Sequence, residues 1–80
     1  GRGAVYYIRL VKRIDRGNPQ INRMARKVVS TYHVKARDAI RNKHDSAARQ
    51  LLWIAGRIIK EFNLTKMNKA HEILKHRLGE

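Results

Sequence analysis

Hydrophobic positions recur with the 3.6-residue period of an α-helix in four successive segments of the chain. The first helix is predicted over residues 4–15, where apolar positions fall on one side and basic positions on the other. A strand is the alternative for this segment because it is rich in β-forming residues, but no second segment offers a pairing partner. The apolar side of the helix consists of Ala4, Tyr7, Leu10, Val11 and Ile14, with Tyr6 at its edge.

The clearest boundary in the chain is the sequence Arg16-Gly17-Asn18-Pro19. Gly17 suits the position after a helix, Asn18 suits an N-cap, and Pro19 suits the first helical position. The pattern that follows predicts a helix over residues 19–43, roughly 37 Å long at 1.5 Å per residue, which Ser30 and Thr31 would bend or split. Its expected buried side consists of Ile21, Met24, Ala25, Val28, Tyr32, Ala36, Ala39 and Ile40.

Two further helices are predicted in the second half of the chain. The third begins after an N-cap at Asp45 or Ser46 and runs to about Phe62, and the fourth is capped by Thr65 and ends at Gly79. The buried side of the third is expected to hold Ala47, Ala48, Leu51, Ile54, Ala55, Ile58, Ile59 and Phe62. The fourth is expected to bury Met67, Ala70, Leu74 and Leu78.

These segments predict an all-α fold: one domain over residues 1–80, built as a small bundle of about four amphipathic helices including one long helix. Residues 1–3 would form a short flexible basic arm. A chain of 80 residues makes only a small core, and the short neighbouring helices cannot fully cover the long helix. Oligomerisation is therefore expected to complete the bundle. Gly56 in mid-helix costs about 1 kcal/mol relative to Ala, so another helix or a phosphate backbone is expected to approach closely there.

The charge of the chain is strongly positive, with 19 Lys and Arg against 6 Asp and Glu and a net charge of +13. Nucleic acid is the partner that this charge favours, because each neutralised phosphate releases condensed counterions. The basic residues occupy the helix sides opposite the apolar positions. The candidate nucleic-acid-binding residues are Arg2, Arg9, Arg13, Arg16, Arg23, Arg26, Lys27, Arg37, Arg41, Arg49, Arg57 and Lys60.

Trp53 falls on the polar side of the third predicted helix, one turn from both Arg49 and Arg57 and two turns from Lys60. Three roles fit an indole ringed by cations. It can anchor a subunit interface, which we favour, or stack on nucleic acid, or lie over the arginine stems as a cation–π shelf.

Other chemistries find little support in the sequence. The chain has no Cys and no Gly-rich phosphate loop, and its carboxylates are scattered, so neither an enzyme nor a small-molecule substrate or cofactor is expected. Metal binding is not expected either. His71 and His76 would point to different faces, whereas His33 and His44 are isolated in the pattern. No apolar run is long enough to predict a membrane-spanning helix or a signal peptide.

Residues 7–14, the loop after them and Ile21-Asn22 loosely resemble the first helix, loop and central-helix start of histone-fold proteins. The chain lacks the Arg-Thr-hydrophobic signature of the second histone-fold loop, so no functional residue is carried over. Size and charge are also generically similar to those of small helical viral nucleocapsid proteins.

The function expected from the sequence is sequence-nonspecific packaging of nucleic acid by a self-associating protein. Its setting would be a virion, as a nucleocapsid or coat subunit, or an intracellular nucleoprotein such as chromatin. Double-stranded DNA is favoured because no single-strand-reading motif is present. RNA or ribosome binding is the first alternative, and a cationic membrane-surface protein is the second.

Overall fold

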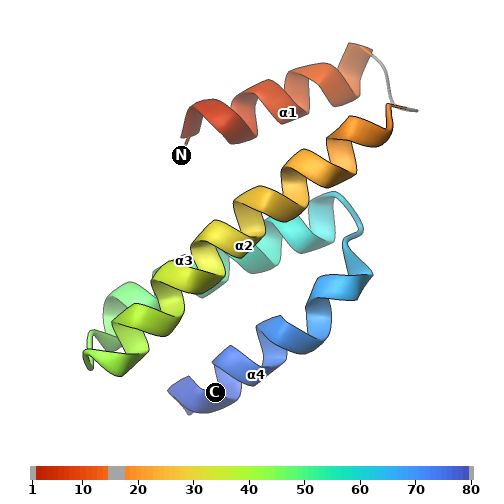
Figure 1. Cartoon of the computed structure of the whole chain (residues 1–80). Helices are drawn as coiled ribbons and strands as arrows, with labels where there is room; N and C mark the ends of the chain where they lie inside the picture. The colour runs from red at the N-terminus through yellow and green to blue at the C-terminus, as the bar shows by residue number, and fades with distance from the viewer. Residues whose placement is uncertain (1, 15–17, 80) are drawn as a thin grey trace.

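Four α-helices and one short 3-10 helix follow one another in a computed structural model of the chain, which describes residues 2–14 and 18–79 (Figure 1). Within these ranges no strand occurs, so the predicted all-α class is confirmed and the strand alternative for the first segment is wrong. The helices are α1 (Arg2–Ile14), α2 (Pro19–Arg41), α3 (Asp45–Glu61), η1 (Thr65–Met67) and α4 (Asn68–Leu78).

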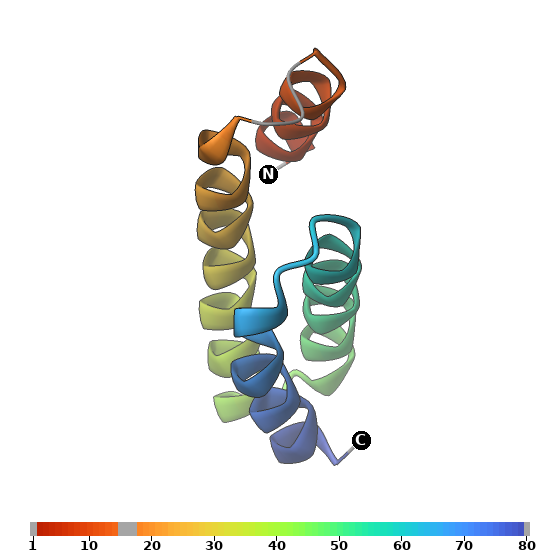
Figure 2. The same ribbon diagram turned by 90° about the vertical axis from the view of Figure 1, so that its right-hand side faces the viewer.

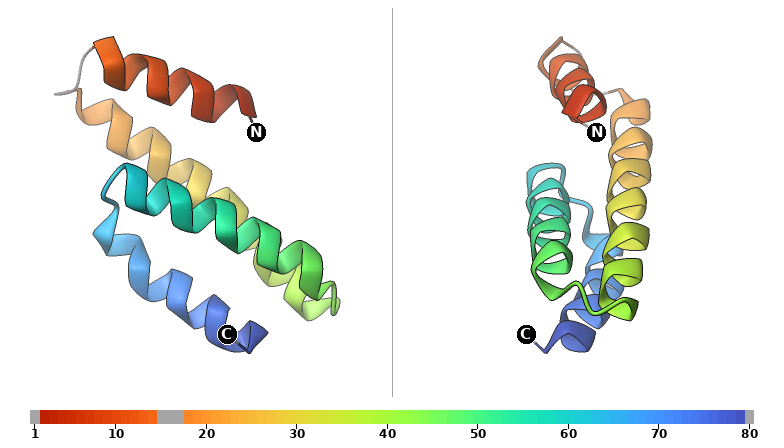
Figure 3. Two further views of the ribbon diagram at one scale, coloured as in Figure 1. Left: turned by 180° about the vertical axis from the view of Figure 1, so that it is seen from behind. Right: turned by 90° about the vertical axis from the view of Figure 1, so that its left-hand side faces the viewer.

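Helices α2 and α3 run antiparallel and pack along their lengths, and α4 contacts both of them (Figures 1 and 3). Helix α1 lies over the first half of α2, at the end of the molecule away from the C-terminus (Figure 2). The Cα positions extend over 40 × 23 × 14 Å, so the long α2 sets the longest dimension. None of the helices in the described ranges combines the length and apolar character that crossing a membrane requires.

Helix α1 buries a different side from the one predicted. Its fully buried side chain is Ile8, which is 1% exposed, whereas Tyr7 is 55% exposed although the sequence placed it in the core. Val5 and Val11 flank Ile8 at a spacing of three residues, so one narrow side of α1 meets the rest of the protein. The helix already begins at Arg2, where the sequence predicted a flexible arm.

Helix α2 begins as the sequence predicts. The side chain of Asn18 accepts a hydrogen bond from the backbone N–H of Gln20 at 2.9 Å, and Pro19 opens the helix. The helix is continuous to Arg41, because the Thr31 hydroxyl donates to the Lys27 carbonyl within the helix and does not interrupt it. The predicted helix stop at 16–17 lies outside the described residues.

The caps predicted for the last two helices are wrong. His44 occupies the N-cap of α3 without a side-chain hydrogen bond, and Asp45 lies within the first turn. Thr65 begins η1 and does not cap α4. Backbone groups stabilise the turn between α2 and α3 instead. The N–H of His44 donates to the Ala39 carbonyl, and Lys43 lies in the left-handed region. The predicted end of α4 is confirmed by left-handed Gly79.

The core consists of a large cluster joining α1, α2 and α3 and a smaller one joining α2, α3 and α4. Val29 and Leu52 are buried although the sequence left them off the inner faces, whereas Ala47 and Ala70 are exposed. Fully buried alanines let the backbones of α2 and α3 approach closely along their length. These alanines are Ala25, Ala36, Ala48 and Ala55.

Candidate nucleic-acid interface

A stripe of four exposed arginines follows α2 on the side that faces away from α3. At 100° per residue these positions lie within about 60° of one another, and they lie about 80° to 160° around the helix from buried Ala25 and Ala36. The first and last are 18 residues apart, which is five turns or about 27 Å. We call this set the α2 arginine stripe; its members are Arg23, Arg26, Arg37 and Arg41.

Arg9 has a structural partner. Its guanidinium donates to both carboxylate oxygens of Glu61, at 2.8 and 3.0 Å, which lowers the pKa of Glu61 and raises the pKa of Arg9. Beside this pair, the ammonium of Lys12 donates to the Glu61 carbonyl at 3.1 Å and lies 4.8 Å from the Phe62 ring centroid. These contacts hold α1 to the end of α3, so Arg9 is less available to a phosphate than the sequence predicted.

The other predicted binding residues differ in placement. Arg13 and Lys27 are exposed on α1 and α2, where they extend the positive surface beyond the α2 arginine stripe. Arg16 and the side chain of Arg2 lie outside the described part of the structure. The remaining three, Arg49, Arg57 and Lys60 of α3, come together in a groove, where Lys75 of α4 joins them. The sequence pattern did not identify Lys75 as a binding residue.

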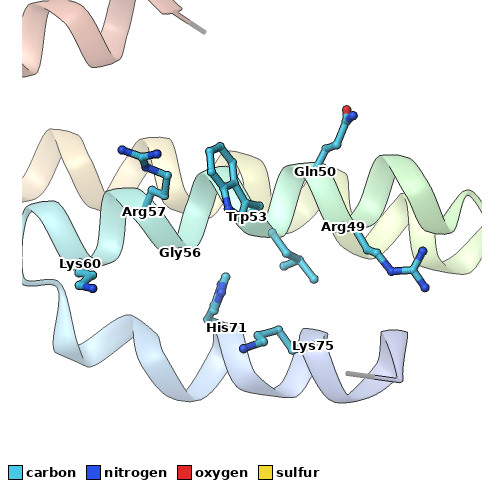
Figure 4. A pocket seen from close by; sticks show the side chains of 9 residues that line it. Arg49, Gln50, Trp53, Gly56, Arg57, Lys60, His71 and Lys75 are labelled. Carbon is cyan, nitrogen blue, oxygen red and sulfur yellow. The ribbon is translucent and has the colours of Figure 1, made fainter.

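This groove lies between α3 and α4 and has a volume of about 630 Å³ (Figure 4). Trp53 is 63% exposed, and the Arg57 Cζ atom lies 5.0 Å from its ring centroid, which is the predicted cation–π arrangement. The role of Trp53 as a subunit anchor stays a prediction. We call this site the Trp53 groove; it is lined by Arg49, Gln50, Leu52, Trp53, Gly56, Arg57, Lys60, His71 and Lys75.

Below the groove, two histidines form a buried pair. The Nε2 of His33 and the Nδ1 of His71 are 2.9 Å apart, and both residues are about nine-tenths buried. Burial lowers the pKa of both residues, and the neighbouring His71 lowers that of His33 further. The pair is therefore neutral near pH 7, with one ring donating to the other. The prediction that His33 is isolated is wrong, because α4 brings His71 to it.

His71 also explains the glycine in α3. A Cβ atom on Gly56 would lie 3.1 Å from the His71 Nε2 atom and 3.5 Å from its Cε1 atom. The close approach predicted at Gly56 is thus made by a side chain of α4. Because the bond to His33 fixes the ring, His71 has little room to move away.

Replacing Gly56 with Ala is therefore expected to give none of the stabilisation, about 1 kcal/mol, that Ala normally brings to a helix interior. In a His71→Ala background the same change should stabilise by about that amount, because the space is then free. Denaturant unfolding of the four proteins of this cycle measures the difference. An equal gain in both backgrounds would show that His71 does not constrain this position.

A smaller groove of about 270 Å³ lies on the other flank of α4, against α2. Val34 and Ile73 are about half exposed on its rim, and Arg37 and Arg77 add positive charge. His33 lines this groove and His71 lines the Trp53 groove, so the histidine pair links the floors of the two. Over the described ranges, no three His, Asp or Glu residues come together in a way that could hold a metal ion.

Comparison of the chain with protein-family models, with curated proteins and with solved structures finds no match.

Proposed function

We propose that this protein binds nucleic acid without sequence preference and packages it, by laying the α2 arginine stripe along the phosphate backbone. The observation that carries the proposal is the stripe itself: four exposed guanidinium groups along one continuous helix. The single carboxylate of α2 belongs to Asp38, which the pattern places beside the stripe. A row of positive charge about 27 Å long matches a polyanion better than any small ligand.

Duplex DNA is the form of nucleic acid that the stripe fits best. Phosphates follow each other closely along a duplex, so long, flexible arginine side chains on a straight helix can reach several of them in many registers. Contacts of this kind carry no sequence information. RNA remains the alternative partner, because its phosphates present the same charge.

Packaging also requires contacts between copies of the protein. Helix α1 supports such contacts, since Tyr6 is 71% exposed and Tyr7 and Leu10 are also exposed on its outer side. Three large apolar side chains on one short helix are a suitable contact surface for a second copy. Sedimentation at increasing protein concentration tests this part of the proposal, which a monomer at all concentrations would contradict. A coat or nucleocapsid subunit and a chromatin protein both fit this arrangement.

The proposal is tested by comparing affinities for duplexes of equal length and different sequence. Equal affinities are expected, with each chain covering about 6 to 7 base pairs if all +13 charges are matched by phosphates. A strong preference for one sequence, or a much larger site, would contradict backbone binding.

A further inference from the structure

We propose that the Trp53 groove is a second nucleic-acid site, which takes an unpaired nucleotide of a single strand. The base would stack on the exposed indole, and the flanking phosphates would lie among the surrounding cations. The site goes beyond the proposed function, because it uses other residues, another face of the molecule and another form of nucleic acid. It is therefore open to a separate test.

The Trp53 groove and the α2 arginine stripe are carried by different helices: the groove lies between α3 and α4, and Arg37 of the stripe lines the smaller groove between α2 and α4. On α2 the arginines lie about 80° to 160° around the helix from buried Ala25 and Ala36, and on α3 Trp53 points away from buried Ala48 and Ala55. In Figure 4, α2 passes behind α3 while the groove opens between α3 and α4. One chain can therefore hold two segments of nucleic acid at once, which is what packaging requires.

The indole is well placed for stacking. More than half of Trp53 is open to solvent, although the helix that carries it is packed in the core. Arg57 lies against the ring, and an arginine in this position also places a positive charge next to a stacked base. Aromatic stacking tolerates every base, so the site needs no sequence preference.

The charge of the groove selects an anion. Arg57 and Lys60 of α3 and Lys75 of α4 line it together with Arg49, and no carboxylate is part of the lining. Two of these cations have an acidic neighbour: the Glu72 Oε1 lies 3.8 Å from the Lys75 ammonium, and Arg57 is close enough to Glu61 to lower the pKa of that carboxyl. At that distance the ion pair of Lys75 with Glu72 is weak, and the Lys75 side chain, which is 37% exposed, can still contact a phosphate.

The floor of the groove offers a polar contact. The Nδ1 atom of His71 is held by His33, and its Nε2 atom lies so close to Gly56 that a Cβ atom there would come within 3.1 Å of it. When the His33 Nε2–H donates to His71, the hydrogen on His71 is at Nε2 and can be donated to a ligand in the groove.

The shape of the groove favours an unpaired base over a duplex. A volume of about 630 Å³ is in the range of small-molecule sites, so it accommodates a nucleotide. The base faces of a duplex are already covered by their stacked neighbours and cannot reach an indole. A single strand exposes them.

The test uses the intrinsic fluorescence of the protein, because Trp53 is its only tryptophan. Titration with a short single-stranded oligothymidylate should quench the emission, whereas the matched duplex should leave it nearly unchanged. Trp53→Leu should weaken oligothymidylate binding about 5- to 150-fold, as expected for the loss of one stacking contact, and change duplex affinity less than twofold. Trp53→Phe should keep part of the affinity.

Two outcomes would overturn the second site. One is unchanged emission at saturating oligothymidylate, and the other is a Trp53→Leu variant that binds oligothymidylate as tightly as the wild-type protein. Quenching that follows protein concentration without nucleic acid would also overturn it and assign Trp53 to a subunit interface. A variant with the α2 arginine stripe reversed should still show quenching by oligothymidylate. If the wild-type protein fails to bind duplex while the quenching persists, the proposed function fails and the second site stands.

Discussion

Reversing the charge of the whole α2 arginine stripe to glutamate should lower affinity for duplex DNA at least a thousandfold at about 0.1 M salt. Each phosphate contact contributes close to a factor of ten under these conditions, through release of condensed counterions, and four contacts would be lost. The loss should be the same for every duplex sequence, because backbone contacts read none. Fluorescence anisotropy with labelled duplexes measures it.

A matched pair of variants separates the effect of the stripe on duplex affinity from the effect of net charge. The arginine pair carries Arg37→Glu with Arg41→Glu, and the lysine pair carries Lys66→Glu with Lys69→Glu. Both pairs change the net charge equally, but the lysines belong to η1 and α4 and not to the stripe. We expect about a 50-fold loss or more for the arginine pair, and a much smaller loss for the lysine pair. Equal losses would show that overall charge, and not the stripe, determines binding.

Acidification should destabilise the protein through the buried histidine pair. Because the folded-state pKa of His33 and of His71 is lowered, the unfolded chain binds more protons as pH falls. The stability contributed by the neutral pair is complete above the unfolded pKa of about 6.5 and is lost as pH falls from there through the lowered folded pKa. The slope of the free energy of unfolding against pH reaches about 1.4 kcal/mol per pH unit for each proton taken up.

Charged groups near the histidine pair also affect its protonation. Lys75 lowers the pKa of His71 and Glu72 raises it, while Arg37 lines the groove beside His33. Replacing both histidines with glutamine preserves a hydrogen-bonding pair that does not titrate. Urea unfolding between about pH 7.5 and pH 5.5 should therefore show a much flatter profile for this double variant.

The matched control replaces His44 and His76, which are exposed, with glutamine. This control should keep the pH dependence of the wild-type protein. A wild-type stability that does not fall with pH would contradict the neutral buried pair.

Much of the fold follows from local sequence. Asn18 and Pro19 define the start of α2 because an N-cap and a first-turn proline act through the nearest backbone groups. Gly79 ends α4 for a similarly local reason, its left-handed conformation. Such signals need no knowledge of the tertiary structure.

The predictions from sequence are wrong where the packing of helices against one another determines which side chains are buried or in contact. Tyr7 is exposed because α1 meets the core along one narrow side, and periodicity alone does not reveal how wide that side is. His33 and His71 are 38 residues apart, so their contact depends on how α4 packs against α2. Gly56 did signal a close approach, but the approaching residue is known only from the structure.

The same limit applies to the candidate site. The α2 arginine stripe is readable from one helix, since its members share a side by spacing alone. The Trp53 groove is not, because Lys75 comes from a different helix than the α3 residues around it.

The most direct measurement of the central claim is the salt dependence of duplex affinity for the unmodified protein. If the α2 arginine stripe lies on the phosphate backbone, the logarithm of the association constant should fall linearly with the logarithm of salt concentration. The slope should be about −3.6, the value for four contacts, or steeper, and it should be the same for different sequences. An affinity that stays constant between low and high salt would contradict phosphate binding.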